Sequence, residues 1–365
     1  MSTTTTTATE ELPSQSVVLG DRETLKADFN YWGTTTDPQE SELLAIFTGK
    51  STGLRAVQCP VTDIRPIGLS SFNLGTHGFQ VLKHSSALLP PQADSIPDFH
   101  DEKHINATYW PELVSMLKSQ LGVRSAVAVG STVRDIQEND PDEFDHKLPR
   151  RFLGKSLQPF FIVHGDYTPA GARAHFRAVV PTYFEELNNM EGTTERERKE
   201  FFQFRDEVIA AEEKAMKEEG VTDQWAWSGK NYAGPRWGYL SVWRALETVH
   251  RDPLGVMDPR SLFRPGVEKP YIGLQRDYRD RPGFEKPFKS ENLLAVAPQR
   301  GDEHKWYYIS QQTPEEVYAL KLFDSDAQKE GSTVAPFGAH SAFSLPDQES
   351  EKVRRSVEVR VMVIW

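Results

Sequence analysis

The sequence lacks several features that would each point to a class of protein. Cys59 is the only cysteine in 365 residues, so the chain can form no internal disulfide and no thiolate metal cluster. It has 42 lysine and arginine residues against 53 aspartate and glutamate residues, and the net charge of -11 argues against a nucleic-acid-binding surface. No apolar run approaches the length of a membrane span. Any metal would have to be held by histidine, aspartate or glutamate.

The N-terminus also lacks the parts of a secretory signal. Residues 1–20 are polar and rich in threonine, with no basic start and no apolar stretch, so we predict a disordered tail and a cytoplasmic protein. The whole chain is 38% hydrophobic and 11% aromatic, which is enough for a sizeable core. Because no linker or internal repeat divides the remainder, we predict a single domain over residues 21–365.

The rest of the chain contains many strand patterns and few helical ones. Helical spacing predicts helices over 109–118 and 193–220, and the Pro-, Gly- and Arg-rich stretch 264–289 is typical of a long surface loop. The two element types do not alternate as βαβ units do. We therefore predict a mainly β protein with added helices, in which a double-stranded β-helix core (jelly-roll, cupin-like) carries a helical insertion around 181–235. Strands are expected at 56–61, 78–84, 125–129, 237–246, 305–310 and 356–365.

One predicted strand ends in a histidine, a spacer and an aspartate. Because side chains alternate along a strand, His164 and Asp166 can face one point while Gly165 turns away. A second His-x-Asp sequence at 250–252 precedes Pro-Leu-Gly, so we expect it at a turn. The pattern is common by chance, and a lone histidine at a strand end is usually only hydrogen-bonded. One imidazole and one carboxylate nevertheless lack only a second histidine to complete the ligand set of a non-haem Fe(II) oxygenase.

The C-terminal part offers that histidine and a group suited to an anion. His340 lies among small residues at the start of a short apolar strand, and Arg354 and Ser356 follow a segment that predicts a turn. In a jelly-roll, neighbouring strands can direct all three side chains to the same interior. Arginine can grip a carboxylate through two hydrogen bonds and serine can add a hydroxyl, as the far carboxylate of 2-oxoglutarate requires. Arg360 is the alternative arginine, and each arginine taken alone could instead be a solvated charge.

Four further side chains are candidates to contact a substrate. Arg244 could bind a substrate carboxylate, with a structural ion pair as an equal alternative. Arg134 is a candidate of the same kind. Trp243 and Phe343 could line a pocket, although aromatic side chains on strands more often belong to the core.

Together these motifs resemble one family. The chain is similar to the fungal family of AsaB-type and gibberellin desaturase-like hydroxylases/desaturases, which is related to the small cephamycin methoxylation protein. The resemblance runs through most of the chain, and its motifs are specific as a set rather than singly. The matching segments are Asn30-Tyr31, Phe79 to His84, Val133-Arg134, Phe161 to Ala172, Val242 to Arg244, His304 to Tyr308, Phe323 to Ser325, His340 to Phe343 and Arg354 to Arg360.

The resemblance implies a double-stranded β-helix and Fe(II)/2-oxoglutarate-dependent oxygenase chemistry with dioxygen. It selects His164 and Asp166 over the second His-x-Asp pair, and we expect these two residues and His340 to bind the iron. The expected substrate is a small molecule, either an amino acid or a secondary metabolite. Hydrogen abstraction from it would lead to hydroxylation, desaturation or oxidative ring closure.

Two other functions stay open at this point. A metal-free jelly-roll protein that binds a small molecule would use the same fold, and a methyltransferase is a less favoured alternative because the chain lacks the glycine-rich turn of a Rossmann methyltransferase. No nucleic-acid or membrane partner is expected, and a homo-oligomer is left open. The long interval between Asp166 and His340 is unusual for the family, and the helical insertion must account for it.

Overall fold

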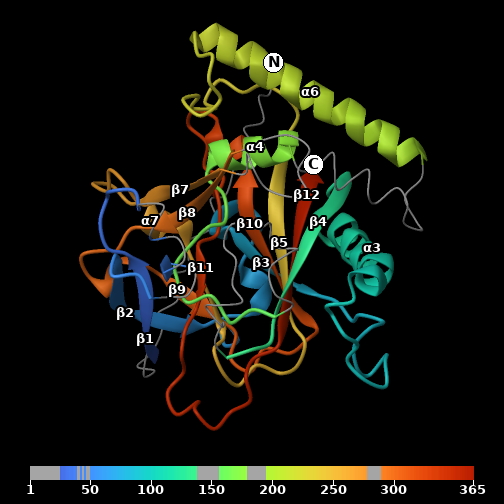
Figure 1. Ribbon diagram of the computed structural model, residues 1–365, viewed down its shortest axis with the longest axis vertical. Coiled ribbons are helices and arrows are strands. Elements are labelled where there is room, and N and C mark those ends of the chain that lie inside the picture. The colour runs from blue at the N-terminus through green and yellow to red at the C-terminus, as the bar shows by residue number, and fades with distance from the viewer. Residues whose placement is uncertain are drawn as a thin grey trace, which may run out of the picture.

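The structure consists mainly of β-strands with a few helices around them (Figure 1). It is a computed structural model, and it describes residues 25–38, 42, 45–46, 50–137, 156–178, 195–277 and 289–365. The predicted tail at residues 1–20 lies outside these residues. Within the described part of the chain, no helix is both long enough and apolar enough to cross a membrane.

The larger of two five-stranded sheets has the strand order β3-β10-β5-β12-β4, and all of its neighbouring strands are antiparallel. Every residue of its two central strands β10 and β5 is buried, because both faces of the sheet are covered. The strands are β3 (Phe79–Lys83), β10 (Glu316–Asp324), β5 (Trp237–Ala245), β12 (Ser356–Ile364) and β4 (Ser125–Arg134).

Helix α3 (Glu102–Leu121) covers the outer face of this sheet (Figure 1). Its Leu113 packs in one apolar cluster with Val242 of β5 and Val359 of β12. Because strand side chains alternate, the neighbours of these two valines face the opposite way, toward the second sheet. The helix starts earlier than the predicted 109–118, so its proline lies inside the helix rather than in the first turn.

The smaller sheet lies against that inner face. Its Val256 on β6 packs with Trp243 of β5 and Leu320 of β10, so the two sheets share a core. Its strand order is β1-β2-β9-β6-β11. The strands are β1 (Leu25–Trp32), β2 (Leu54–Asp63), β9 (Trp306–Tyr308), β6 (Leu254–Met257) and β11 (His340–Ala342).

A two-stranded sheet formed by β7 (Tyr271–Asp277) and β8 (Lys289–Ala295) completes this side of the molecule. The prediction of a surface loop over 264–289 was therefore wrong for β7. Ile272 and Leu274 alternate into a buried cluster, but the surrounding proline, glycine and arginine residues masked this short alternation.

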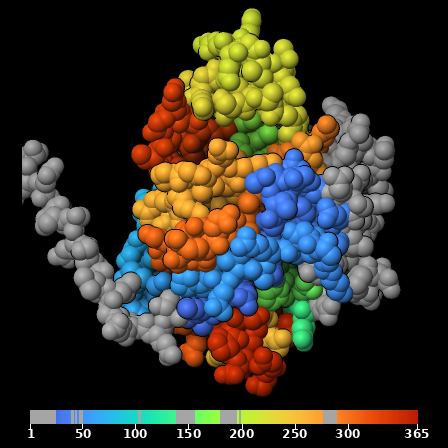
Figure 2. Space-filling view, turned by 90° about the vertical axis from the view of Figure 1, so that its left-hand side faces the viewer, coloured from blue at the N-terminus to red at the C-terminus, as the bar shows by residue number. Residues whose placement is uncertain are grey.

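Two helices cover one end of the larger sheet. They are α4 (Pro169–Ala178) and α6 (Glu195–Glu219), and the predicted helix over 193–220 is confirmed as α6. Figure 2 shows α6 end-on at the top of the molecule. Its apolar residues Phe204 and Val208 pack with Phe176 of α4. The remaining short helices are η2 (Leu69–Ser71), α2 (Leu74–His77), α7 (Pro259–Leu262), η4 (Gly301–Glu303) and η5 (Ser325–Gln328).

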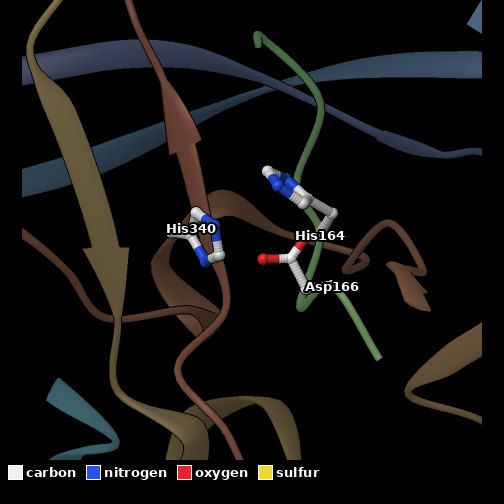
Figure 3. A group of neighbouring side chains, drawn as sticks. All are labelled: His164, Asp166 and His340. Carbon is white, nitrogen blue, oxygen red and sulfur yellow. The ribbon is translucent and has the colours of Figure 1, made fainter. Parts of the chain in front are cut away.

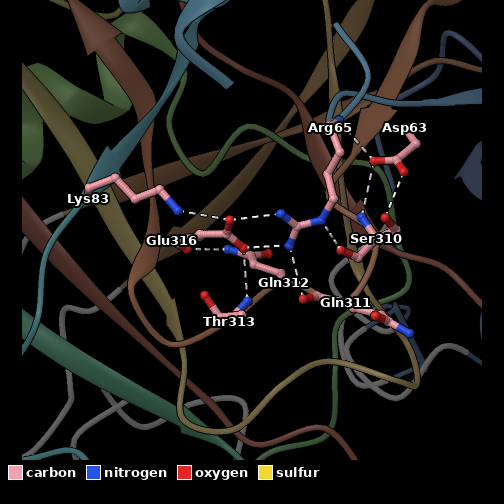
Figure 4. Close-up of polar contacts among 8 residues, drawn as sticks. All are labelled: Asp63, Arg65, Lys83, Ser310, Gln311, Gln312, Thr313 and Glu316. Atoms are coloured by element: carbon pink, nitrogen blue, oxygen red, sulfur yellow. Dashed lines mark hydrogen bonds and ion pairs between the residues drawn. The ribbon is translucent and has the colours of Figure 1, made fainter. Parts of the chain in front are cut away.

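A buried carboxylate ties the edges of the two sheets together (Figure 4). Glu316, at the start of β10, accepts hydrogen bonds from the guanidinium of Arg65 at 2.6 and 2.9 Å, from Lys83 Nζ at 2.9 Å and from the Thr313 amide at 3.0 Å. Arg65 follows β2 of the smaller sheet, and Lys83 ends β3 of the larger one. Burial acts to raise the pKa of Glu316, but these hydrogen bonds outweigh it and lower the pKa to about 2.

Candidate metal centre

Three buried side chains that could bind a metal ion converge beside the inner face of the larger sheet. One nitrogen each of His164 and His340 and one oxygen of Asp166 lie within 4.8 Å of one another, and Figure 3 shows the three side chains pointing toward a common centre. None of the three residues is more than 8% exposed. Two imidazole nitrogens and one carboxylate oxygen are the donor set of 2-His-1-carboxylate sites.

Backbone pairing places the two histidines opposite each other. The His164 amide donates to the His340 carbonyl at 3.1 Å, and the His340 amide donates to the His164 carbonyl at 2.9 Å. Their ring centroids are 4.2 Å apart. The segment that carries His164 thus lies between β11, which begins at His340, and Leu294 of β8. Residues far apart in the sequence therefore become direct neighbours across the sheet.

Each histidine is held in the tautomer that suits a metal ligand. His164 Nδ1 lies 2.8 Å from the Ile162 carbonyl oxygen, and His340 Nδ1 lies 3.0 Å from that of Gly338. Because a carbonyl oxygen can only accept, both Nδ1 atoms carry the proton, and the Nε2 lone pairs are left for a metal. Burial, followed by the proximity of His340, lowers the pKa of His164 to about 3, so its imidazole is neutral.

The turn that carries Asp166 is held by strand β8. Asp166 has a φ of 61°, in the left-handed region that aspartate tolerates better than most residues. The side-chain amide of Asn292 donates to its carbonyl oxygen, and the Gly165 amide donates to the Leu293 carbonyl at 3.1 Å. A Cβ on Gly165 would lie 2.8 Å from the ring of Phe337, so the spacer must be small. Sequence reasoning missed Asn292, because a single asparagine on a strand carries no pattern.

Arg360 contacts the carboxylate of the metal-ligand group. Its Nη2 lies 2.6 Å from Asp166 Oδ1, and its guanidinium carbon lies 5.6 Å from the ring centre of Tyr167. Burial opposes the charge, but the nearby Asp166, Tyr167 and Glu358 raise the pKa of Arg360 above its ordinary value. Arg360, expected as the alternative arginine for the far carboxylate of 2-oxoglutarate, thus contacts a predicted metal ligand instead.

Arg354 and Ser356 present buried polar atoms without partners. Arg354 Nη1 donates to the Asp252 carbonyl, and its guanidinium lies 5.1 Å from the ring centre of Trp243. Among the described residues, Arg354 Nε and Ser356 Oγ have no hydrogen-bond partner although both are buried. Burial, and then the nearby Arg134, lower the pKa of Arg354 to about 9. A buried cation and a hydroxyl in this state fit an incoming carboxylate.

The second His-x-Asp sequence has a different environment. His250 is exposed, and the carboxylate of Asp252 accepts hydrogen bonds from Gln348 Nε2 at 2.6 Å and from Arg251 Nε at 3.2 Å. As expected, these residues lie at a bend between β5 and β6. Asp252 contributes to the site through its backbone carbonyl, which accepts a hydrogen bond from Arg354, and its carboxylate charge acts to raise the pKa of that arginine.

The four candidate substrate contacts lie in different places. Arg244 faces α3, away from the metal-ligand group. Its guanidinium donates to Tyr109 Oη at 2.8 Å, to the His84 carbonyl at 2.9 Å, to His84 Nδ1 at 2.6 Å and to the Pro314 carbonyl at 2.6 Å. Arg134 lies on the inner side, where it pairs with Glu358 at 3.0 Å.

The two aromatic candidates, Trp243 and Phe343, also lie in different parts of the core. Trp243 faces the second sheet and lies beneath Arg354. Phe343 is fully buried against Phe29 and Tyr308, with ring centres 5.4 and 5.5 Å away, in the cluster on the other side of the smaller sheet. Of the four, the structure therefore brings Trp243 and Arg134 to the interior that Ser356 and Arg360 share.

The donor set and the mainly β fold together are those of non-haem iron oxygenases. Comparison with known proteins gives the family. Residues 29–194 and 212–364 match the family described as Oxidoreductase/YMDC permease-like domain, and the chain belongs to this family.

Curated relatives cover nearly the whole chain. The Gibberella fujikuroi protein named gibberellin cluster GA4 desaturase is 30% identical over 84% of this chain and 86% of its own length. The alpha-ketoglutarate-dependent dioxygenase phiK from a fungal species is 27% identical over 93% of this chain and 96% of its own length. These matches confirm the predicted resemblance and the predicted enzyme class, an Fe(II)/2-oxoglutarate-dependent oxygenase. They do not favour a metal-free binding protein or a methyltransferase.

A solved structure shares the fold. The iron and alpha-ketoglutarate-dependent endoperoxidase NvfI aligns over 94% of this chain and 99% of its own, with a TM-score of 0.56 and 20% sequence identity. The mainly β architecture with few helices is thus that of an oxygenase of this kind.

Proposed function

We propose that His164, Asp166 and His340 bind Fe(II), and that the protein uses 2-oxoglutarate and dioxygen to oxidise a small molecule. The observation that carries this proposal is the convergence of two imidazole nitrogens and one carboxylate oxygen within 4.8 Å, in a buried site. When bound, the iron and its cosubstrates supply the oxidant that removes a hydrogen atom from the substrate.

The interior beside these ligands suits the cosubstrate. Arg354 Nε and Ser356 Oγ would donate to the far carboxylate of 2-oxoglutarate, which supplies the partner that these buried groups lack. Trp243 supports the guanidinium from one side, and the Asp252 carbonyl fixes one of its nitrogens. These contacts orient the arginine before the ligand arrives, so little conformational entropy is lost on binding.

The reaction would be a hydroxylation, a desaturation or an oxidative ring closure. The relatives named desaturase and dioxygenase support this range of outcomes, which share hydrogen abstraction as the first event. The substrate would be an amino acid or a secondary metabolite. Arg134 and Trp243 are the candidate residues that face the interior where it would bind.

The wider organisation is proposed as follows. Residues 21–365 form one domain with a double-stranded β-helix (jelly-roll, cupin-like) core. Two facing five-stranded sheets support this assignment; the larger is antiparallel, and the smaller is antiparallel except for its parallel β2–β9 pair. The helical insertion spans about 181–235 and includes α6. The protein would act in the cytoplasm without a nucleic-acid or membrane partner.

An anaerobic metal titration tests the proposal. Fe(II) and then 2-oxoglutarate are added to the apoprotein, and the visible charge-transfer band of the chelate is recorded. We expect a band for the wild type and for His250→Ala, which removes an exposed histidine. His164→Ala should bind no iron and give no band. Equal iron binding by His164→Ala and the wild type would refute the assignment of the ligands.

A further inference from the structure

Asp166 has two carboxylate oxygens, and a protein side chain already holds one of them. Arg360 Nη2 lies 2.6 Å from Oδ1, which is the geometry of a charge-assisted hydrogen bond. The pair is well shielded, since the side chains of Arg360 and Asp166 are only 19% and 6% exposed. An ion pair protected from water in this way is much stronger than one on the surface.

The position of Arg360 in the sheet fixes its direction. It pairs with Ser241 of β5 in the centre of the larger sheet, on the face that looks toward the metal-ligand group. On its other side, the register between β12 and β4 shifts between Val359 and Val361. Register shifts of this kind re-aim a side chain relative to its neighbours. Arg360 therefore extends from a rigid strand rather than from a loop.

Aromatic side chains support the guanidinium from behind. Its carbon lies 5.6 Å from the ring centre of Tyr167, and the Tyr167 ring lies 5.2 Å from that of Tyr239. Tyr239 Oη in turn lies 3.1 Å from His175 Nδ1 on α4. Arg360 therefore contacts a group of packed aromatic side chains as well as Asp166, and these contacts restrict its conformation.

We propose that Arg360 is a positioning residue that makes Asp166 a one-oxygen metal ligand. This inference rests on the proposed function. While Oδ1 is bonded to Arg360, a metal meets less competition at Oδ2, and chelation through both oxygens would have to compete with the ion pair for Oδ1. A carboxylate can bind a metal in either mode. The one-oxygen mode keeps more of the coordination sphere open for 2-oxoglutarate and dioxygen, as this class of site requires.

Mn(II)-loaded protein tests the inference without turnover. Arg360→Met removes the hydrogen-bond donor at similar length, whereas Arg360→Lys keeps a cationic donor. Water-proton relaxation counts the water molecules on Mn(II), and titration with N-oxalylglycine, an unreactive analogue, measures access for the cosubstrate. In Arg360→Met we expect Mn(II) to stay bound, the inner-sphere relaxation to fall by about one third because one of three open positions is lost, and the dissociation constant of N-oxalylglycine to rise about tenfold. Arg360→Lys should recover most of both changes.

Arg65→Met is the matched control, because Arg65 pairs with the buried carboxylate of Glu316 instead of Asp166. It should leave the water count unchanged. An unaltered water count in Arg360→Met would overturn the inference, and so would loss of Mn(II) from Arg360→Met with recovery in Arg360→Lys. A wild-type protein that binds no Mn(II) or Fe(II) would instead refute the proposed function.

Discussion

Replacing Arg354 with methionine should affect 2-oxoglutarate binding and the stability of the apoprotein in different ways. The guanidinium is buried, has no ion pair among the described residues, and has an unpartnered Nε. We expect Arg354→Met to weaken 2-oxoglutarate binding strongly while leaving the stability of the apoprotein unchanged or higher. Methionine is similar in length and apolar, so it can fill the space over Trp243 without an uncompensated charge.

The lowered pKa of Arg354 sets an upper bound on how far its buried charge destabilises the folded protein. A fall from 12.5 to about 9 corresponds to roughly 5 kcal/mol of free energy as an upper bound, and this penalty on the charged folded state applies in full below about pH 9. Loss of the bond to the Asp252 carbonyl offsets about 1–3 kcal/mol of the gain from removing the charge. For binding, loss of the charged contact from Arg354 Nε, about 1.5–3 kcal/mol, raises the dissociation constant roughly 10- to 150-fold.

The assay is titration of N-oxalylglycine into Mn(II)-loaded protein, paired with urea unfolding of the metal-free protein. Arg244→Met is the control, because this equally buried arginine donates to several acceptors on the α3 side of the sheet. It should lower the free energy of unfolding by about 3–5 kcal/mol with little change in affinity. If Arg354→Met changes the dissociation constant less than threefold, the reasoning about its unpartnered charge is wrong.

Two further changes test the framework of the site. Glu316 has a folded pKa of about 2 against an ordinary value of 4.5, so its stabilisation is present above pH 4.5 and is lost as the pH falls toward 2. Arg65 is one-third exposed, so solvent screens part of this ion pair. We expect Glu316→Gln to lower the free energy of unfolding at pH 7 by roughly 2–3 kcal/mol and to flatten the fall in Tm between pH 4.5 and 2. An unchanged dependence of Tm on pH would contradict this. Gly165→Ala should cost about 1–3 kcal/mol and weaken Mn(II) binding, because its Cβ would meet the Phe337 ring. Adding Phe337→Leu should restore part of both losses, and no rescue would show that the contact is not the cause.

Local pattern predicted that His164 and Asp166 face one point, but not the backbone that achieves it. Asp166 lies in a turn with a φ of 61° rather than on an extended strand, and the small residue between the two fits the space beside Phe337. The pairing of His164 with His340 could not be derived from spacing, because backbone hydrogen bonds between distant segments set it. Residue context suggested His340 as the second histidine, and the resemblance to a family then selected His164 and Asp166 as its partners.

The alternation of side chains along β5 and β12 explains which of the candidate residues face the interior. Trp243 and Arg244 are consecutive, so only one of them can face the interior, but the sequence does not show which face α3 covers. Arg354 and Ser356 were expected to face the same interior, and Arg354 lies over Trp243, which faces the second sheet. The contact between Arg360 and Asp166 depends on how two segments far apart in the sequence align in space, and the sequence alone does not show this alignment.

The backbone bonds between His164 and His340 have a consequence for how the enzyme can diversify. The two segments hold each other directly, while the chain between them includes β5 and β10 of the larger sheet, so added residues lengthen the connections between such elements. Lengthening a flexible connection is inexpensive, at about 0.6 kcal/mol for each doubling of its length. The long interval that looks anomalous in the sequence therefore leaves the ligands in place. New helices and covering segments can be added there to recognise a different substrate, while the oxidising centre is inherited unchanged.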